Sequence, residues 1–378
     1  MYFKFLYQMV VKNELIYFVT MCSSTNATNY FRRYFLSDYK MQTAIILLNY
    51  NGWQDTVACI DSISCVKDDI VSVIVVDNCS TNDSYEQINR YISDNYARLH
   101  YSQYLTIDYN ELGDTVNTLN HPFICLVKSG HNGGFAYGNN VGIRVARRLY
   151  NFEYFWMLNS DTLLTSDALT PMLNKINADT NIGIVGSVLI YMDPQNTIQA
   201  LGGVHFHRHL ARGDQIANGL NLSQLDRFNE ANINLDYIAG ASMLVRASFL
   251  DSVGLMSEGY FLYYEELDWA FRAKRKGYSL AVALDSHVLH KEGASIGTSS
   301  KETRSLLSEY YLSRNILICY KLFIPLYLPI AIVRNIVNCI KLLKTKDIER
   351  IKVILRATLD GLVGRGRDRR VHLSAKKN

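Results

Sequence analysis

Short apolar segments, each ending in a cluster of polar residues, recur along this sequence. The segments and the clusters that follow them are 73–76 with Asp77-Asn78, 155–158 with Asn159-Ser160-Asp161, 261–264 with Glu265-Glu266 and Asp268, and a last segment that ends at His290. In an open α/β sheet, ligands bind in the crevice outside the carboxyl ends of the strands. Acidic side chains and a histidine at several such ends therefore predict a single site that holds a metal ion and a phosphorylated ligand.

Between these clusters, strand character alternates with helical spacing. Residues 43–48 form an unbroken apolar run, as expected for a parallel strand buried on both faces, and the next residues place Val57, Ile60 and Ile63 at helical intervals. Further strands are expected at 72–76, 123–127, 154–158, 182–190, 237–245 and 279–284, and further helices from 83 onward and at 136–150, 166–177 and 267–276. This alternation predicts a doubly wound α/β domain over roughly residues 42–300.

Two polar stretches interrupt the alternation. Residues 91–121 are polar, rich in tyrosine and irregular, so we expect a long surface excursion. Residues 193–236 are polar and are expected to be mostly loops. Asp83-Ser84-Tyr85-Glu86 is typical of a capping box, and it predicts the start of the helix that precedes the first stretch.

The C-terminal region, residues 301–378, is apolar and basic, and we expect it to be helical. Between 316 and 333 the residues are mostly apolar and only Lys321 is charged, which is near the lower length limit of a membrane-spanning helix. Pro325 and Pro329 would break or kink such a helix. An interfacial or re-entrant segment is therefore favoured over a full span.

The net charge and the cysteine content exclude some kinds of binding partner and site. The chain has 378 residues, 48% of them hydrophobic, and a net charge of only +4, which is too small to predict nucleic acid binding. Its seven cysteines are an odd number without C-x-x-C spacing, which favours reduced thiols in the cytosol over a disulfide framework or a zinc site. Residues 1–41 are apolar with scattered charges. They are either a small membrane-contacting appendage or an over-extended gene start.

Three of the clusters suit a nucleotide. Asp77 can accept a hydrogen bond from a base or a ribose hydroxyl, although an aspartate at this position is also a common turn former and helix cap. On the neighbouring strand end, Asn49-Tyr50-Asn51 could place the Tyr50 ring against a base. Asn132-Gly133-Gly134, with Asn139 behind them, lie between a strand and a helix, where glycines let the backbone approach a phosphate closely.

Asn159-Ser160-Asp161 and His290 suit a metal ion. Mg²⁺ and Mn²⁺ bind oxygen ligands and commonly keep phosphates and waters in their shell, so Asp161 plus a diphosphate would satisfy them. Asn159 could ligate through its carbonyl or bind ribose, and the simpler role for Asp161 is to cap the following helix. A lone histidine is usually structural, but His290 returns to the same predicted sheet edge, where a neutral imidazole can bind a metal.

Glu265-Glu266-x-Asp268 begins a helix that carries basic residues in its later turns. Acidic residues at a helix start are favoured by the helix dipole, and this is the simplest interpretation. The approach through residues 261–264 is apolar and aromatic, however. A carboxylate held at such an edge can have its pKa raised and serve as a general base. The residues alone leave both interpretations open.

Taken in order, these motifs resemble those of family 2 glycosyltransferases of the GT-A fold, and most of all the rhamnosyltransferase-like members. The matching segments are 45–53, 75–82, 132–144, 158–162, 240–246, 261–268 and 290–295. Any one segment is a weak signal, but seven in order over about residues 43–320 are specific. The resemblance implies the GT-A fold, a doubly wound mixed sheet, followed by a helical membrane-associating C-terminal region.

The resemblance also implies roles for individual residues. Glu266 would be the general base, with Glu265 and Asp268 beside it, and Asp161 and His290 would hold Mg²⁺ or Mn²⁺. The donor would be bound by Asn49, Tyr50, Asn51, Asp77, Asn78, Asn132, Gly133, Gly134, Asn139, Asn159 and Ser160. Two residues depart from the family pattern. Asn159 replaces the first aspartate of D-x-D, and Glu266 replaces the usual aspartate, which leaves open whether Glu265 or Glu266 reaches the acceptor.

The implied activity is an inverting, metal-dependent transfer of a sugar, with rhamnose as first candidate, from a dTDP- or UDP-sugar. The acceptor would be a glycan or polyprenyl-linked glycan in cell-surface polysaccharide assembly, framed by residues 193–236 and 296–315. The enzyme would lie peripherally on the cytoplasmic face of the membrane. A sugar nucleotidyltransferase is disfavoured because residues 49–53 lack the basic residue of an activating loop. A non-catalytic partner in a polysaccharide assembly complex is the remaining alternative.

Overall fold

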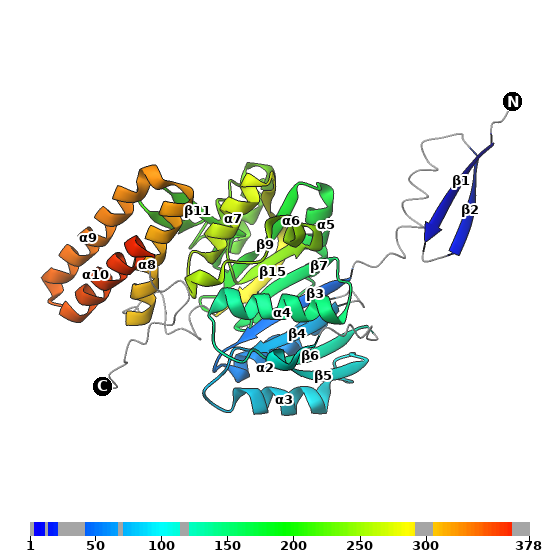
Figure 1. Cartoon of the computed structure of the whole chain (residues 1–378). Coiled ribbons are helices and arrows are strands. Elements are labelled where there is room, and N and C mark those ends of the chain that lie inside the picture. Colours follow the sequence, from blue (N-terminus) through cyan, green and yellow to red (C-terminus); the bar gives the residue numbers. More distant parts are fainter. Residues whose placement is uncertain are drawn as a thin grey trace. The chain divides into compact units, whose positions relative to one another are not determined.

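The computed structural model describes the backbone of residues 4–11, 14–21, 42–66, 71–113, 121–291 and 305–364, with side chains from Gln42 onward. The chain divides into two units, Met1–Met41 and Gln42–Asn378. In the first unit, β1 (Lys4–Val11) pairs antiparallel with β2 (Glu14–Met21). The second unit contains every residue predicted for the site, and most of its helices and strands are labelled in Figure 1.

A ten-stranded mixed sheet lies at the centre of the second unit, and its order is β5-β6-β4-β3-β7-β14-β9-β15-β8 with β10 paired to β9. The strands are β3 (Thr43–Asn49), β4 (Val71–Asp77), β5 (Gln103–Asp108), β6 (Phe123–Lys128), β7 (Tyr154–Asn159), β8 (Thr162–Leu163), β9 (Ile182–Tyr191), β10 (Ile198–Leu201), β14 (Ser242–Arg246) and β15 (Ser279–His290). Strands β5, β6, β4, β3 and β7 are parallel, whereas β14 is antiparallel to both neighbours. The predicted doubly wound mixed α/β sheet is confirmed.

Helices cover both faces of this sheet. They are α2 (Trp53–Ser62), α3 (Ser84–Asn95), α4 (Phe135–Leu149), α5 (Leu169–Ala178), α6 (Ala247–Val253) and α7 (Glu265–Arg275). Helix α4 lies across β3 and β4 (Figure 1), and it approaches closely because a Cβ on Gly138 would lie only 2.2 Å from the Leu48 side chain. Helix α2 contacts the opposite face, since its Thr56 donates a hydrogen bond to Asn49, the next residue of β3.

The strand register brings the polar clusters to one edge of the sheet. Asn49, the last residue of β3, lies opposite Asp77, the last residue of β4. On the other side of β3, Leu48 lies opposite Asn159, the last residue of β7. Strand β14 lies antiparallel between β7 and β9, which restores the original direction in β9 and in its parallel neighbour β15. His290 therefore ends β15 at the same edge of the sheet.

The two polar stretches contain more regular structure than expected. Within 91–121, β5 adds a parallel edge strand beside β6. Within 193–236 lie β10, β11 (Gly203–His207) and β12 (Arg212–Gln215), and a second sheet has the order β12-β11-β13, with β13 at Tyr237–Ile238. Short 3-10 helices lie at Ile63–Cys65, Tyr109–Glu111, Leu222–Arg227, Glu230–Asn232, Glu258–Tyr260 and Pro325–Tyr327. These strands are short or only half-buried, so their sequences lack the long apolar runs of the central strands.

Two strand predictions had the wrong bounds. The stretch 237–245 is two strands, β13 and β14, because the residues at 239–241 turn between the two sheets. The strand expected at 279–284 continues to His290 as β15, and a change of register after Ala283 absorbs the polar residues that follow.

The capping box predicted for α3 is wrong. The Asp83 side chain makes no capping hydrogen bond, because Asp83 already has near-helical backbone angles, φ −78° and ψ 16°. The backbone N–H of Ser84 donates instead to the side chain of Asn82, at 3.1 Å. Asp83 accepts from the side chain of Gln87 at 2.9 Å.

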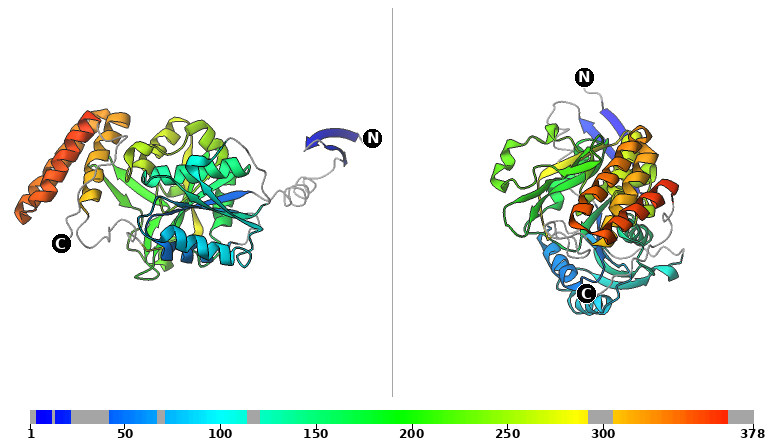
Figure 2. Two further views of the ribbon diagram at one scale, coloured as in Figure 1. Left: turned by 60° about the horizontal axis from the view of Figure 1, so that its bottom comes forward. Right: turned by 90° about the vertical axis from the view of Figure 1, so that its left-hand side faces the viewer.

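Three helices follow the sheet and pack against one another, as Figure 2 shows: α8 (Leu306–Phe323), α9 (Leu328–Thr345) and α10 (Ile348–Val363). The apolar stretch 316–333 is therefore not one segment, because α8 ends before Ile324 and Pro325. Its first part is buried inside the protein. In the part of the chain that the structure describes, one segment, Pro325–Thr345, is long and apolar enough to cross a membrane, and little of it is buried.

Candidate active site

Asp77, at the end of β4, is held by three hydrogen bonds. Its carboxylate accepts from the amide of Asn49 at 2.8 Å, from the Ser80 hydroxyl at 2.6 Å and from the Ser80 backbone N–H at 3.0 Å. Asn49 is itself fully buried, and its own carbonyl accepts from Thr56 at 2.9 Å. Asn49 therefore supports Asp77 from beneath, and the Asp77 side chain, 4% exposed, is fixed in orientation by these bonds.

The loop after β3 is tied to the loop after β4. Asn51 has a left-handed backbone (φ 59°), its side chain accepts from the Thr81 backbone N–H at 2.8 Å, and its own N–H donates to Ser80 Oγ at 2.9 Å. Tyr50, the residue before it, is half-buried. The predicted base-binding residues therefore lie on two loops that are braced against each other.

Asn78 joins this edge to the loop at the start of α4. Its amide donates to Asn132 Oδ1 and to the Gly134 carbonyl, each at 3.1 Å. Gly134 has φ 88°, and a Cβ there would lie 2.0 Å from the carbonyl oxygen of Phe261, so only glycine fits. Gly133 is likewise crowded, by the ring of Tyr137. Both glycines are required by packing as well as by any approach to a ligand.

Two of three further predicted donor-binding residues have their side chains engaged with the protein. Asn139 is 2% exposed, and its amide donates to the Phe135 carbonyl one turn back in α4. Ser160 is 5% exposed, and its hydroxyl donates to the Leu48 carbonyl at 2.9 Å. Asn159 has a half-buried side chain and is the most open of the three. Asn139 and Ser160 thus contribute to the shape of the edge more than to its surface.

Asp161 and His290 meet where β8 pairs with β15. Nε2 of His290 lies 3.3 Å from Oδ1 of Asp161, and Nδ1 of His290 lies 2.8 Å from Oε1 of Gln199 on β10. Burial by itself would raise the pKa of Asp161, but the hydrogen bond and charge of His290 outweigh it and hold this pKa below its ordinary value. Asp161 is therefore an ionised carboxylate at neutral pH, with an imidazole beside it.

Glu266 lies next to this edge, on the first turn of α7. A Cβ on Gly240 would lie 2.5 Å from Oε1 of Glu266, so the carboxylate is packed against the Gly240 backbone. The next residue, Ala241, accepts a hydrogen bond at 3.0 Å from the backbone N–H of Asn159. The turn at 239–241 thus connects Glu266 with the strand end that carries Asp161.

The two adjacent glutamates have different surroundings. Glu265 is 1% exposed, burial and the neighbouring charge of Glu266 raise its pKa well above the ordinary value, and its Oε2 has no hydrogen-bond partner in the described residues. Glu266 is half-buried, and burial raises its pKa to about 7. Glu266 is therefore the member of the pair that a ligand can reach.

Asp268 has a structural environment. It is 3% exposed, it forms an ion pair with Nε of Arg272 at 2.6 Å, and it accepts a hydrogen bond from the Tyr260 hydroxyl at 3.0 Å. An aspartate with both oxygens engaged in this way anchors α7 to the preceding segment. We assign Asp268 this anchoring role in place of the catalytic one.

Sequence reasoning missed several residues around the site. Gln199 lies 91 positions before His290, in a stretch expected to be loops, so no local pattern signals its contact. Tyr237 lies near the glutamate pair, and burial together with the charge of Glu266 raises its pKa well above the ordinary value. Gly240 belonged to one of the matching segments, and this could have indicated its place beneath Glu266.

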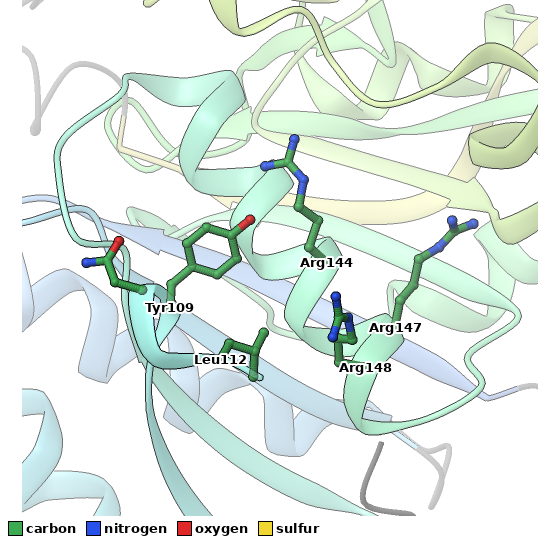
Figure 3. Close-up of a pocket in the computed structure, with 6 residues that line it drawn as sticks. Tyr109, Leu112, Arg144, Arg147 and Arg148 are labelled. Atoms are coloured by element: carbon green, nitrogen blue, oxygen red, sulfur yellow. The ribbon is translucent and has the colours of Figure 1, made fainter. Parts of the chain in front are cut away.

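A cavity of about 450 Å³ lies elsewhere, at the C-terminal end of α4 (Figure 3). Figure 3 shows Tyr109 and Leu112 facing the arginines of α4. Arg144 pairs with Glu258 and Arg147 with Asp251, each at 2.7 Å, and Arg148 donates to the Gly113 carbonyl at 2.8 Å. These cations already have protein partners, and the cavity holds none of the predicted site residues.

The sequence matches the family model for glycosyl transferase family 2 over residues 109–254. This stretch contains the Gly133-Gly134 loop, the Asn159-Ser160-Asp161 turn and Gly240, which the fold brings to the Glu266 edge. Over this stretch the chain is similar to family 2 glycosyltransferases. Glu266, Asp77 and His290 lie outside the matched stretch, and the fold places them at the same sheet edge as the matched residues.

Two transferases are similar to part of the chain. The chain is 23% identical over 226 residues to the low-salt glycan biosynthesis hexosyltransferase Agl10 of Haloferax volcanii, covering 59% of this chain and 68% of the relative. It is 22% identical over 174 residues to rhamnosyltransferase WbbL of Escherichia coli, covering 43% of this chain and 62% of that one.

Solved structures of glycosyltransferases are also similar in part. The mannosyltransferase PcManGT of Pyrobaculum calidifontis, solved with GDP-Man and Mn²⁺, has a TM-score of 0.48 and 13% identity, covering 86% of this chain and 88% of its own. GalNAc-T7, solved with UDP, GalNAc and Mn²⁺, has a TM-score of 0.49 and 14% identity, covering 75% of this chain and 48% of its own.

Proposed function

We propose that this glycosyltransferase moves a sugar from a nucleoside diphosphate donor to a hydroxyl group of a glycan, with inversion at the anomeric carbon. The observation that carries the proposal is the position of Glu266. It is a half-buried carboxylate whose pKa burial raises to about 7, and it packs against Gly240 in the turn at 239–241. In the same turn, the Ala241 carbonyl accepts a hydrogen bond from the backbone N–H of Asn159, two residues before Asp161. A base and a site for a charged leaving group therefore lie side by side.

Glu266 takes the proton from the acceptor hydroxyl. As the proton leaves, the hydroxyl oxygen forms its bond to the anomeric carbon, the bond from that carbon to the diphosphate oxygen breaks, and the nucleoside diphosphate departs on the opposite side. A base is most effective when its pKa is near the working pH, which matches Glu266. Glu265 is closed to the acceptor because it is fully buried.

Asp161 and His290 fit a divalent cation. With a cation bound, a neutral His290 would carry its proton on Nδ1, donated to Gln199 Oε1, and its Nε2 lone pair and the Asp161 carboxylate, whose atoms lie 3.3 Å apart, would both face the cation. Two electron-pair donors that face each other suit a bound cation. Mg²⁺ or Mn²⁺ held here would neutralise charge on the departing diphosphate.

The protein offers only part of a metal shell. In the ranges that the structure describes, no group of three or more histidine, cysteine, aspartate or glutamate side chains is arranged around one point. Mg²⁺ and Mn²⁺ sites of this kind are commonly completed by substrate phosphates and water. Donor and cation would therefore bind together, which predicts that each strengthens the binding of the other.

The donor would lie along the ends of β3 and β4. Tyr50 would contact the base, and Asp77 would accept from the base or the ribose, as its fixed carboxylate allows. The hexosyl and rhamnosyl transferases among the relatives support a hexose or rhamnose as the sugar. We propose a dTDP- or UDP-sugar as the donor class.

The acceptor would be a lipid-linked glycan at the cytoplasmic face of the membrane. The α9 helix exposes a row of apolar side chains, Val333, Ile336, Val337, Ile340 and Leu343. Lys341 and Lys344, both exposed, lie on the same helix. Apolar side chains next to lysines suit a helix that lies in the interface of an anionic membrane. Peripheral attachment through α9 would keep the catalytic edge near the acceptor.

The test is release of nucleoside diphosphate from a panel of sugar nucleotides, with Mg²⁺ or Mn²⁺ and membrane extract as the acceptor source. Wild type is compared with Glu266→Gln and Asp161→Ala. We expect metal-dependent turnover of one donor, lost in both variants. Donor binding without turnover in the wild type would favour a non-catalytic partner in a polysaccharide assembly complex. Failure to bind any donor would contradict the site.

A further inference from the structure

The segment before Glu265, residues 259–264, is strained. Phe261, Tyr263 and Tyr264 have φ values of 68°, 66° and 75°. Residues other than glycine rarely adopt a backbone with positive φ. Each such residue costs on the order of 1–3 kcal/mol and persists only where the surroundings hold it. This approach loop, residues 259–264, therefore needs an external support.

Asn315 of α8 supplies hydrogen bonds to three carbonyls of the approach loop. Its amide nitrogen lies 3.0 Å from the Tyr260 oxygen, 2.7 Å from the Leu262 oxygen and 3.0 Å from the Tyr263 oxygen. Asn315 is fully buried, so water does not compete for these carbonyls. A single side chain thus satisfies acceptors on both sides of Phe261 and on the strained Tyr263 itself.

Arg314 fixes the orientation of Asn315. Its Nε donates to Asn315 Oδ1 at 2.8 Å, which turns the amide nitrogen of Asn315 toward the loop. Its Nη2 donates to the Gly259 carbonyl at 2.6 Å. The guanidinium also lies over the rings of Tyr310 and Tyr311, at 5.9 and 5.1 Å. Arg314 and Asn315 together form a clamp, and both members are 0% exposed.

The approach loop touches both halves of the site. The Phe261 carbonyl accepts from the Phe135 N–H at 2.9 Å, directly after the glycine pair of the donor side. The Phe261 ring stacks on Tyr311 of α8 with centroids 4.8 Å apart. At its other end the loop continues into Glu265 and Glu266. A change in the loop would therefore move the base relative to the donor side.

We propose that Arg314 and Asn315 are positioning residues for the proposed transfer reaction, because their clamp on the strained approach loop sets where Glu266 meets the acceptor. The inference rests on the proposed function for its kinetic part. It also assigns α8 a role beyond attachment of the C-terminal helices. The catalytic edge and the helical region are joined by buried hydrogen bonds rather than by loose packing.

The test compares Asn315→Leu with Asn335→Leu in the full chain. Asn335, on α9, is equally buried, and its amide donates to the Ser313 carbonyl and Thr358 Oγ1, so it is a matched control away from the loop. Asn315→Asp is a second variant, because it keeps the shape and replaces the N–H donors by an oxygen that repels the three carbonyls. Hydrogen exchange of the peptide 259–268 is measured with kcat, the donor Kd and the pH profile.

For Asn315→Leu and Asn315→Asp we expect faster exchange in 259–268 and a fall in kcat of about 10²-fold, with a smaller change in donor Kd, since small misplacement of a reacting group has such an effect. The lower limb of the pH profile should move to lower pH, because a released Glu266 is hydrated and loses the burial that raises its pKa. A structural role alone would leave that limb in place. Asn335→Leu should leave exchange in 259–268 and kcat unchanged.

Two results would overturn the inference. Exchange in 259–268 that stays at the wild-type rate in both Asn315 variants would show that the clamp does not hold the loop. Faster exchange with unchanged kcat would show that the loop does not position the base. If the wild type turns over no donor, the proposed function fails, and the exchange data alone then decide whether the clamp exists.

Discussion

At the scale of single residues, burial decides the chemistry of Glu265 and Glu266. Both begin α7 and both are carboxylates, yet one is fully enclosed and the other is half-buried. Desolvation is the first cause of the raised pKa of each. The pair therefore separates into a buried acid and a reachable base.

Replacing Glu266 by glutamine should lower kcat by about 10²–10⁴-fold, the usual contribution of a general base, because the amide cannot take the acceptor proton. Donor affinity should change little, since Glu266 lies on the acceptor side. Glu265→Gln is the control, with the same change one residue away at a buried position, and it should keep most of the activity. Initial rates and calorimetric donor titrations measure both. Equal losses in the two variants would contradict the assignment.

The pKa values also predict the dependence on pH. Activity should rise as pH increases through about 7, where Glu266 becomes ionised. Stability should change in the opposite direction. Both folded-state pKa values lie above the unfolded ones, so the native state binds more protons and loses stability as pH rises from near 4.5 through 7.

Glu265→Gln should consequently raise Tm at pH 8 and have little effect at a pH below the ordinary glutamate pKa. Thermal melts of wild type and variant at the two pH values measure this difference. A variant that is less stable than wild type at pH 8 would show that the Glu265 carboxylate has a stabilising partner in the fold.

At the scale of elements, loops from distant parts of the chain are packed through glycine. Gly134, at the start of α4, meets the Phe261 carbonyl of the approach loop. Gly219 has a similar backbone, φ 82° against 88°, but a Cβ there would meet nothing within 4 Å. A side chain at Gly219 would meet only backbone strain, whereas a side chain at Gly134 would meet both backbone strain and a steric clash.

Gly219→Ala should cost about 1–2 kcal/mol, the price of a left-handed alanine. Gly134→Ala should cost more and should also weaken donor binding and kcat, because the added methyl must displace the approach loop. Urea denaturation measures the stability of each variant, and calorimetry measures the binding of the donor. Equal destabilisation of the two variants would mean that the Phe261 backbone moves away from the added methyl group at little cost.

At the scale of the whole molecule, the C-terminal helices present an apolar surface next to the catalytic unit. The outer face of α9 exposes Ile336, Ile340 and Leu343, and the outer face of α10 exposes Leu355 and Leu359. Isolated apolar residues on a surface are ordinary, but these lie in rows along two adjacent helices, and we propose that the rows form a binding surface.

Ile340→Glu should weaken binding to vesicles that contain anionic lipid, because it places a charge in the apolar row and repels the lipid headgroups. Ser93→Glu adds the same charge on an exposed position of α3 and is the control. Vesicle co-sedimentation measures binding, and turnover with a soluble acceptor should be equal in both variants. Equal vesicle binding by the two variants would remove α9 from the contact.

Much of the fold could be predicted because it is encoded locally. Unbroken apolar runs specify β3, β4, β6 and β7, and polar clusters mark where each strand ends. Since parallel strands end together, the meeting of Asp77 and Asn159 at one edge follows from those runs, whereas His290 reaches the edge through the change of register in β15. The edge strand β5 escaped prediction because it is only half-buried and carries no apolar run.

The sequence by itself therefore determined the sheet and the edge at which its polar clusters gather, since each depends on patterns within a few residues. Tertiary structure decided the rest. It alone shows that Glu266 is reachable and Glu265 is not, that Gln199 orients His290, and that Asn315 holds the approach loop. The physical reason is that burial and hydrogen-bond partners depend on which distant segments of the chain contact each other. Such long-range contacts produce no periodic pattern in the sequence.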